Sequence, residues 1–263
     1  MADDLNIPEP VLSRLRGAQR VIALTGAGIS AESGIPTFRD LGSGLWSRFD
    51  PDQIATPQAW RRNPRLVWGW YASRRMQAHR VAPNAGHLAL ARLADFYPRF
   101  SVVTQNVDGL HVRAGSRDVI ELHGNIHRVK CSAEDTVVEW TDPQSEDPAA
   151  LDALERGEGP DVPVCPTCGA LLRPDVVWFG EMLPVDAYRR AEELAVTCDA
   201  CLVVGTSAVV QPAADLPRIA RRAGACVVEV NPEETEISAW VDLSLHGPAG
   251  VVLPQLVDLI VGP

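Results

Sequence analysis

Short runs of apolar, largely β-branched residues recur along the chain and are separated by polar or helix-forming stretches. Five of these runs have the length of buried strands: residues 20–25, 100–104, 118–122, 201–205 and 226–230. Continuous apolar runs are typical of parallel strands that are covered on both faces. Because the helical stretches 85–96 and 186–197 lie between such runs, the pattern predicts βαβ units and an α/β fold with a doubly wound parallel sheet.

Two segments break this alternation, and we interpret both as insertions over the sheet. Residues 35–82 hold Trp46, Trp60, Trp68 and Trp70 and are expected to be mostly helical. Residues 125–175 hold three cysteines and are expected to form a zinc-ribbon-like module, with an exposed loop at 141–159. The prediction is a single domain, 1–263. Its larger, Rossmann-like lobe is expected at approximately 10–34, 83–124 and 176–263, and its smaller lobe at 35–82 and 125–175.

Charge and cysteine content narrow the classes of function. The formal net charge is -10, whereas a nucleic-acid surface needs a basic stripe, so no nucleic-acid partner is expected. No apolar run reaches membrane-spanning length, and the acidic residues 1–10 contain no secretion signal. Six cysteines without an export signal favour a reducing compartment over a disulfide framework. We expect a cytoplasmic monomer without a membrane partner.

Small and polar residues gather where the predicted strands end. The five segments concerned are Gly26–Gly28, Gln105–Asp108, His123–Gly124, Gly205–Ser207 and Asn231–Pro232. In an open parallel sheet, ligands bind at the carboxyl ends of the strands. These segments are therefore predicted to form one site.

The first of these segments matches a dinucleotide-binding pattern. Gly26–Ala31 follows a strand and fits G-x-G-x-x-G/A, in which glycines let backbone N–H groups approach a pyrophosphate at a helix N-terminus. Alone, this match is a weak signal, because a tight strand-to-helix turn in any α/β protein can also produce it. The acidic ribose ligand expected about 20 residues later is missing, because Gly44–Trp46 occupies that place. A hydride-transferring dehydrogenase is thus a poor fit.

Longer motifs resemble the sirtuin family. They are Gly26–Arg39 (GAGISAESGIPTFR), Thr104–His111 (TQNVDGLH), Glu121–Gly124 (ELHG), Val176–Glu181 (VVWFGE), Gly205–Ser207, Val230–Asn231 and Gly247–Gly250. The blocks appear in family order between about residues 21 and 256. The resemblance implies an NAD-dependent protein-lysine deacylase. In that reaction the acyl group moves from lysine to ADP-ribose, nicotinamide is released and NAD is consumed.

The resemblance also implies roles for individual residues. NAD would be bound by Gly26, Ala27, Gly28, Glu32, Phe38, Arg39, Gln105, Asn106, Asp108, Gly205, Thr206, Ser207, Asn231 and Ala249. An acyl-lysine peptide would lie as an added strand between residues 176–181 and 209–211. The substrate contacts expected there are Val176, Val177, Trp178, Phe179, Gly180, Glu181 and Val209.

His123, Asn106 and Asp108 are the predicted catalytic residues. A lone histidine is more often structural than catalytic, but a strand-end imidazole with a pKa near neutrality can accept a proton from a ribose hydroxyl. Asn106 is suited to orienting water and ribose oxygens. Asp108 could accept a hydrogen bond from the nicotinamide amide, or simply cap the loop after its strand.

The cysteine spacing departs from the family pattern of two C-x-x-C pairs around zinc. Cys165 and Cys168 form one pair, but the other begins at Cys131 and has Glu134 in place of its second thiol. The fourth ligand is then Glu134 or absent, and structural zinc sites are nearly always built from cysteine and histidine. We expect a weak site that holds little zinc. The pair Cys198 and Cys201 enters a strand and is interpreted as core thiols.

Tyr71 and Arg74 are three residues apart in a predicted helix and share a face. The simplest alternative is a surface arginine that covers an aromatic ring. However, this Y-x-x-R and the small residue Ala55 resemble the sirtuin branch that prefers acidic acyl groups. An arginine fork and a phenol can hold a carboxylate through charge-assisted hydrogen bonds. The resemblance therefore implies desuccinylase activity beside deacetylase activity.

Two other functions remain open. The same ribose electrophile would serve ADP-ribosyl transfer or plain NAD hydrolysis. A non-catalytic NAD or peptide sensor is the third possibility, although the presence of His123, Asn106 and Asp108 together argues against lost catalysis.

Overall fold

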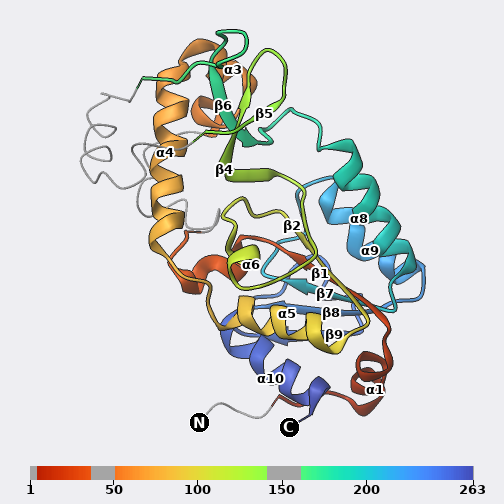
Figure 1. Ribbon diagram of the computed structural model, residues 1–263. Helices are drawn as coiled ribbons and strands as arrows, with labels where there is room; N and C mark the ends of the chain where they lie inside the picture. Colours follow the sequence, from red (N-terminus) through yellow and green to blue (C-terminus); the bar gives the residue numbers. More distant parts are fainter. Residues whose placement is uncertain (1–4, 37–50, 141–160, 263) are drawn as a thin grey trace.

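The computed structural model describes residues 5–36, 51–140 and 161–262 (Figure 1). Its centre is a six-stranded sheet in the order β3-β2-β1-β7-β8-β9, and every neighbouring pair is parallel. The strands are β1 (Arg20–Thr25), β2 (Arg99–Thr104), β3 (Val119–Glu121), β7 (Ala200–Val204), β8 (Cys226–Asn231) and β9 (Leu243–His246). The chain builds outward from β1 to β3 and then crosses to β7 on the other side of β1. This reversal is the topological switch point at which doubly wound sheets bind ligands.

Helices cover both faces of this sheet (Figure 1). One face carries α1 (Glu9–Gly17), α5 (Ala85–Phe96) and α10 (Ala249–Val261), and the other carries α8 (Val185–Thr197) and α9 (Leu216–Arg222). In β1, Val21 and Ala23 belong to the first core, while Ile22 and Leu24 belong to the second. Because successive strand residues point to opposite faces, burial on both sides explains the continuous apolar run.

The smaller lobe combines helices with a three-stranded antiparallel sheet in the order β5-β4-β6. Its elements are α2 (Pro51–Ile54), α3 (Pro57–Arg62), α4 (Pro64–Arg80), β4 (Gly124–Cys131), β5 (Val137–Val138) and β6 (Leu172–Val176). Their shared core is rich in aromatic residues. The buried guanidinium of Arg75 lies 5.3 Å and 5.1 Å from the ring centroids of Trp68 and Trp140, and its Nε donates to the Ile126 carbonyl at 2.8 Å. This packing joins α4 to β4.

The predicted α/β fold, a doubly wound parallel sheet with a smaller lobe, is confirmed. All five predicted strands form, whereas β9 was not anticipated, because its sequence Leu-Ser-Leu-His is short and half polar at the sheet edge. Residues 27–33 form the 3-10 helix η1 rather than an α-helix. The short elements α6 (Leu110–Arg113) and η4 (Ala213–Asp215) complete the described chain. The loop predicted at 141–159 lies outside the described residues.

No helix in the described ranges is long and apolar enough to cross a membrane.

Candidate functional site

The loops that follow β1 and β7 touch each other through their backbones. Gly26 N donates to the Val204 carbonyl at 3.0 Å, and Gly28 N donates to the Gly205 carbonyl at 2.8 Å. Gly205 has φ +59, and a Cβ there would lie 2.4 Å from the Ile29 nitrogen. Only glycine fits that conformation and that approach. The predicted dinucleotide residues Gly26, Ala27 and Gly28 therefore lie beside Gly205, at the switch point.

The loop after β2 is bonded to both of these loops. Asn106 Nδ2 donates to the Gly26 carbonyl at 3.0 Å, and Gln105 Nε2 donates to Thr206 Oγ1 at 3.2 Å. Asp108 is buried and accepts from Ser30 Oγ at 2.7 Å and from Leu110 N at 2.9 Å. The second bond is the loop-capping role considered from the sequence. Hydrogen bonds thus join the loops at the ends of three separate strands.

A buried chain of polar groups lies behind Asp108. Ser30 Oγ lies 3.4 Å from His87 Nε2, and His87 Nδ1 accepts from Asn84 N at 3.3 Å. Burial lowers the pKa of His87 to about 4, against the opposing charge of Asp108, so the imidazole is neutral near pH 7. Ser30 and His87 were not predicted as site residues. Two signals could have found them: Ser30 lies inside the glycine motif, and His87 is the third residue after the helix cap Asn84.

His123 lies in the turn between β3 and β4, facing the loop after β2. Its Nδ1 lies 3.0 Å from the Gln105 carbonyl. A carbonyl only accepts, so Nδ1 carries the proton and Nε2 keeps its lone pair. Burial lowers the pKa of His123, and the hydrogen bond to Gln105 opposes this shift. The next residue, Gly124, has φ +80, and a Cβ there would lie 2.1 Å from the Asp175 carbonyl oxygen, so only glycine lets β6 approach this turn.

The segment after β6 runs beside His123 and is held by backbone bonds. Val177 N donates to the His123 carbonyl and Phe179 N to the Ala55 carbonyl, each at 2.9 Å. Val176 is buried, Gly180 has φ +86 and Val209 is 57% exposed. The predicted substrate residues of this segment therefore connect the turn that holds His123 to the helical part of the smaller lobe.

Glu181, predicted as a substrate contact, is bonded within the protein. Its carboxylate accepts from both terminal nitrogens of Arg173, at 2.6 Å and 2.9 Å, and from Trp178 N at 2.8 Å. Burial raises the pKa of Glu181, but the bonds from Arg173 and Trp178 outweigh it and the net shift is downward. Arg173 was not predicted as a site residue. A charged residue inside a strand of a buried module indicates an ion pair such as the one with Glu181.

Tyr71 and Arg74 lie on α4 close enough for each to shift the pKa of the other. Tyr71 is 7% exposed, and burial raises the pKa of its phenol, with Trp178, Arg173 and Arg74 among the neighbours that act on it. Burial lowers the pKa of Arg74 to about 10, opposed by Tyr71. Arg74 Nη1 also donates to Gln77 Oε1 at 3.1 Å. Arg74 therefore stays cationic at neutral pH in a partly dry environment.

The remaining predicted NAD residues lie around β8 and α10. Asn231 Nδ2 donates to the Thr206 carbonyl at 2.9 Å, which fixes the loop that carries Ser207. Glu32 accepts from Gly250 N at 2.5 Å at the start of α10, next to the buried Ala249. Phe38 and Arg39 lie outside the described residues.

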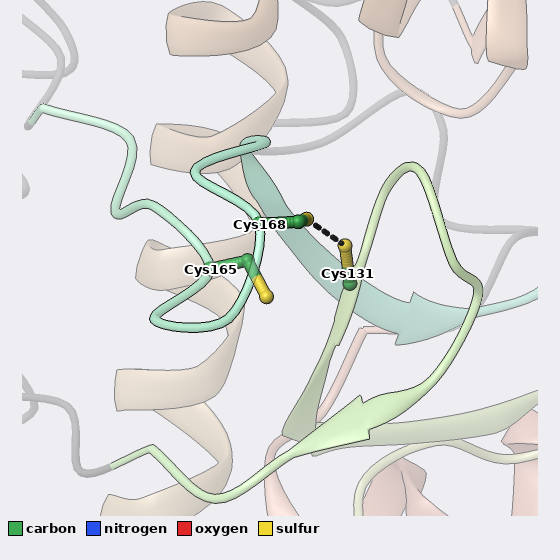
Figure 2. Close-up of side chains that lie close together, drawn as sticks. All are labelled: Cys131, Cys165 and Cys168. Atoms are coloured by element: carbon green, nitrogen blue, oxygen red, sulfur yellow. Dashed lines mark hydrogen bonds between the residues drawn. The ribbon is translucent and has the colours of Figure 1, made fainter.

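The three cysteines Cys131, Cys165 and Cys168 converge at the end of β4 (Figure 2). Their sulfur atoms all lie within 4.8 Å of one another, and Cys131 Sγ lies 3.4 Å from Cys168 Sγ. Backbone N–H groups of Cys168 and Thr167 lower the pKa of the Cys165 thiol to about 7. Among the described residues no fourth ligand joins the cluster, and Glu134 is exposed outside it. The donor set suits a thiophilic metal with three bonds but does not provide the four that closed zinc sites use.

Cys198 and Cys201 are buried as predicted for core thiols, and burial raises the pKa of both; for Cys198 it reaches about 12.

Known proteins resemble this chain over nearly its whole length. The model of the Sir2 family matches residues 26–212. A relative from Ralstonia nicotianae named NAD-dependent protein deacylase is 51% identical over 253 residues, which cover 96% of this chain and 97% of the relative. A crystal structure of a Sir2 homolog–NAD complex has a TM-score of 0.86 at 44% identity and covers 97% of this chain and 94% of its own. A Sir2 structure with a deacetylated p53 peptide and 3′-O-acetyl ADP-ribose has a TM-score of 0.79 at 33% identity and covers 95% and 97%. The chain belongs to the Sir2 family.

Proposed function

We propose that this chain is an NAD-dependent protein-lysine deacylase that transfers the acyl group to ADP-ribose, and that it accepts succinyl as well as acetyl groups. The observation that carries the proposal is the position of His123. Its Nδ1 is bonded to the Gln105 carbonyl, in the same loop as Asn106, and its own carbonyl accepts from Val177 in the predicted peptide segment. His123, whose Nε2 makes no hydrogen bond among the residues that the structure describes, thus joins the dinucleotide loops to the predicted substrate segment.

The residues at the switch point suit NAD as co-substrate. The glycine loops after β1 and β7 bring backbone groups to the place where a pyrophosphate binds in such sheets. Asn106, Asp108 and Gln105 would surround the nicotinamide ribose, and Thr206, Ser207 and Asn231 the adenosine. When bound, NAD supplies an electrophilic ribose carbon and nicotinamide as leaving group.

The chain's own residues then supply proton transfer and orientation. His123 Nε2 accepts the proton of a ribose hydroxyl, which turns that hydroxyl into a nucleophile toward the acyl carbon. The Gln105 carbonyl keeps the other ring nitrogen protonated and fixes the plane of the imidazole. Asn106 and Asp108, held by Gly26 and Ser30, orient the ribose and the carboxamide.

Tyr71 and Arg74 would bind the distal carboxylate of the acyl group. A carboxylate that leaves water needs a fixed cation, and Arg74 is a partly buried cation beside a phenol. The names of the relatives support the general reaction: the Ralstonia protein is called a deacylase, and one solved structure holds a deacetylated peptide together with acetyl ADP-ribose. The proposed acceptance of succinyl rests on the residues of this chain.

Nicotinamide release measured with and without acyl peptide tests the proposal. We expect release to depend on a succinyl- or acetyl-lysine peptide and to be minimal with the unmodified peptide. Equal release without any peptide would indicate NAD hydrolysis and would contradict the deacylase assignment.

A further inference from the structure

Trp178 is almost completely buried, yet its indole N–H lacks a hydrogen-bond partner among the described residues. The residue is 2% exposed, and Nε1 makes no hydrogen bond. Buried polar groups are nearly always paired, because an unpaired donor loses its bonds to water without replacement. An N–H in this state beside the predicted substrate residues still has one hydrogen bond to offer to an acceptor on a ligand.

The indole ring is held in place by Arg173 and Glu181. The Arg173 guanidinium carbon lies 3.4 Å from the ring centroid, and Arg173 is locked by two bonds to Glu181 and one to the Val176 carbonyl at 3.0 Å. The backbone N of Trp178 donates to the same Glu181 carboxylate at 2.8 Å. Because Arg173 offers only donors, it cannot accept from the indole. Arg173 and Glu181 therefore fix the position of the ring, but neither of them accepts a hydrogen bond from its N–H.

The indole lies beside the proposed acyl-binding residues. Its ring centroid is 6.4 Å from that of Tyr71 and 5.7 Å from that of Trp60. The indole lies close enough to the Tyr71 phenol to lower the pKa of that group, as the charge of Arg74 also does, although Nε1 makes no hydrogen bond to the phenol oxygen. The indole N–H and the Arg74 guanidinium therefore both lie near the Tyr71 phenol, and the three donors come from two separate elements.

We propose that the Trp178 indole N–H is a third donor to the distal carboxylate of an acidic acyl group, with Tyr71 and Arg74. This inference rests on the proposed deacylase function. A carboxylate offers about four lone-pair sites, enough for three donors, whereas a methyl end offers none. Trp178 is then a specificity-determining residue, and Arg173 with Glu181 are the positioning residues that aim it.

Matched peptides with succinyl-, butyryl- and acetyl-lysine test this role, because butyryl has the same chain length as succinyl but lacks the carboxylate. For Trp178→Phe we expect kcat/KM for succinyl to fall about tenfold more than for butyryl, the factor of one lost hydrogen bond. Trp60→Phe is the control, since it trims the neighbouring ring and should lower both substrates alike. Equal losses for succinyl and butyryl in Trp178→Phe would overturn the proposal.

A second variant and the activity of the wild type separate the possible outcomes. If Trp178→Phe does not fold, 3-benzothienylalanine at position 178 retains the ring shape and removes only the N–H, and the same selective loss is expected. If the wild-type protein deacetylates but does not desuccinylate, both this inference and the proposed desuccinylase activity fail while the deacylase assignment stands. If the wild type desuccinylates and both variants lose succinyl and butyryl equally, only the role of Trp178 fails.

Discussion

At the scale of single residues, His123 combines a defined tautomer with a lowered pKa. Its Nδ1 proton is held by the Gln105 carbonyl, so Nε2 is the nitrogen that can accept a proton. Burial shifts the pKa downward, which keeps the ring neutral at physiological pH. Both properties suit a general base, and each leads to a separate measurement.

Replacement of His123 by alanine should separate binding from turnover. NAD affinity is expected to change little, because the glycine loops and Asn231 do not contact this imidazole in the described hydrogen bonds. Turnover should fall by a factor of about 10² to 10⁴, the usual contribution of a general base. Calorimetric titration with NAD and peptide deacylation assays give the two numbers. Deacylation at a near wild-type rate would show that another group is the base.

The pH dependence follows from the direction of the same shift. A base works in its neutral form, so activity is lost as the pH falls through its pKa. Because the pKa of His123 lies below the ordinary 6.5, the acid limb of kcat/KM should have its midpoint below pH 6.5. A midpoint above pH 7 that disappears in His123→Gln would contradict the lowered pKa.

Arg74→Met should affect succinyl peptides far more than acetyl peptides. A carboxylate buried without its partner costs about 3–5 kcal/mol, whereas an acetyl group needs no cation. Tyr71→Phe should shift selectivity in the same direction but less, because it removes one hydrogen bond and no charge. The readout is kcat/KM for both peptides with each variant. If kcat/KM fell by the same factor for both acyl groups, Arg74 would not bind the distal end of the acyl group.

Motifs could predict residues that meet at one sheet edge but not residues that act through three-dimensional packing. His123, Asn106 and Asp108 follow predicted strands, and the structure brings them together as the parallel arrangement requires. Ser30 beneath Asp108, and Arg173 against Trp178, come from segments far apart in sequence or turned by local geometry. No periodicity signals such contacts.

At the scale of elements, the three-cysteine cluster lies in a small sheet that also packs on a helix. Cys131 ends β4 and pairs in register with Leu172 of β6, which carries Arg173 toward the substrate segment. The sheet β5-β4-β6 nevertheless packs on α4 through a large aromatic core. The lobe therefore has a source of stability that does not depend on metal.

The purified protein should contain well under one equivalent of zinc, because the cluster offers three thiols and Glu134 stands outside it. Chelator treatment should leave the melting temperature nearly unchanged, since the aromatic core remains. Elemental analysis and thermal denaturation measure these two quantities. A full equivalent that resists dialysis against a chelator would mean that another group completes the site.

At the scale of the whole molecule, the sequence predicted the layered α/β architecture because buried parallel strands leave continuous apolar runs. The edge strand β9 escaped notice, since only one residue of Leu-Ser-Leu-His is buried. The 3-10 geometry of η1 was not predicted either, because the glycine motif indicates a turn into a helix but not the type of helix. Local patterns thus predict strands with continuous apolar runs better than short, half-polar strands and loops.

The stoichiometry of products from one succinyl-lysine peptide tests the central claim most directly. Mass spectrometry after incubation with NAD should find deacylated peptide, nicotinamide and succinyl ADP-ribose in equal amounts, because one NAD is consumed for each lysine released. His123→Ala supplies the matched control and should form almost none of the three. Nicotinamide formed together with ADP-ribosylated peptide, or with free ADP-ribose and intact succinyl peptide, would contradict acyl transfer to ADP-ribose as the reaction of this protein.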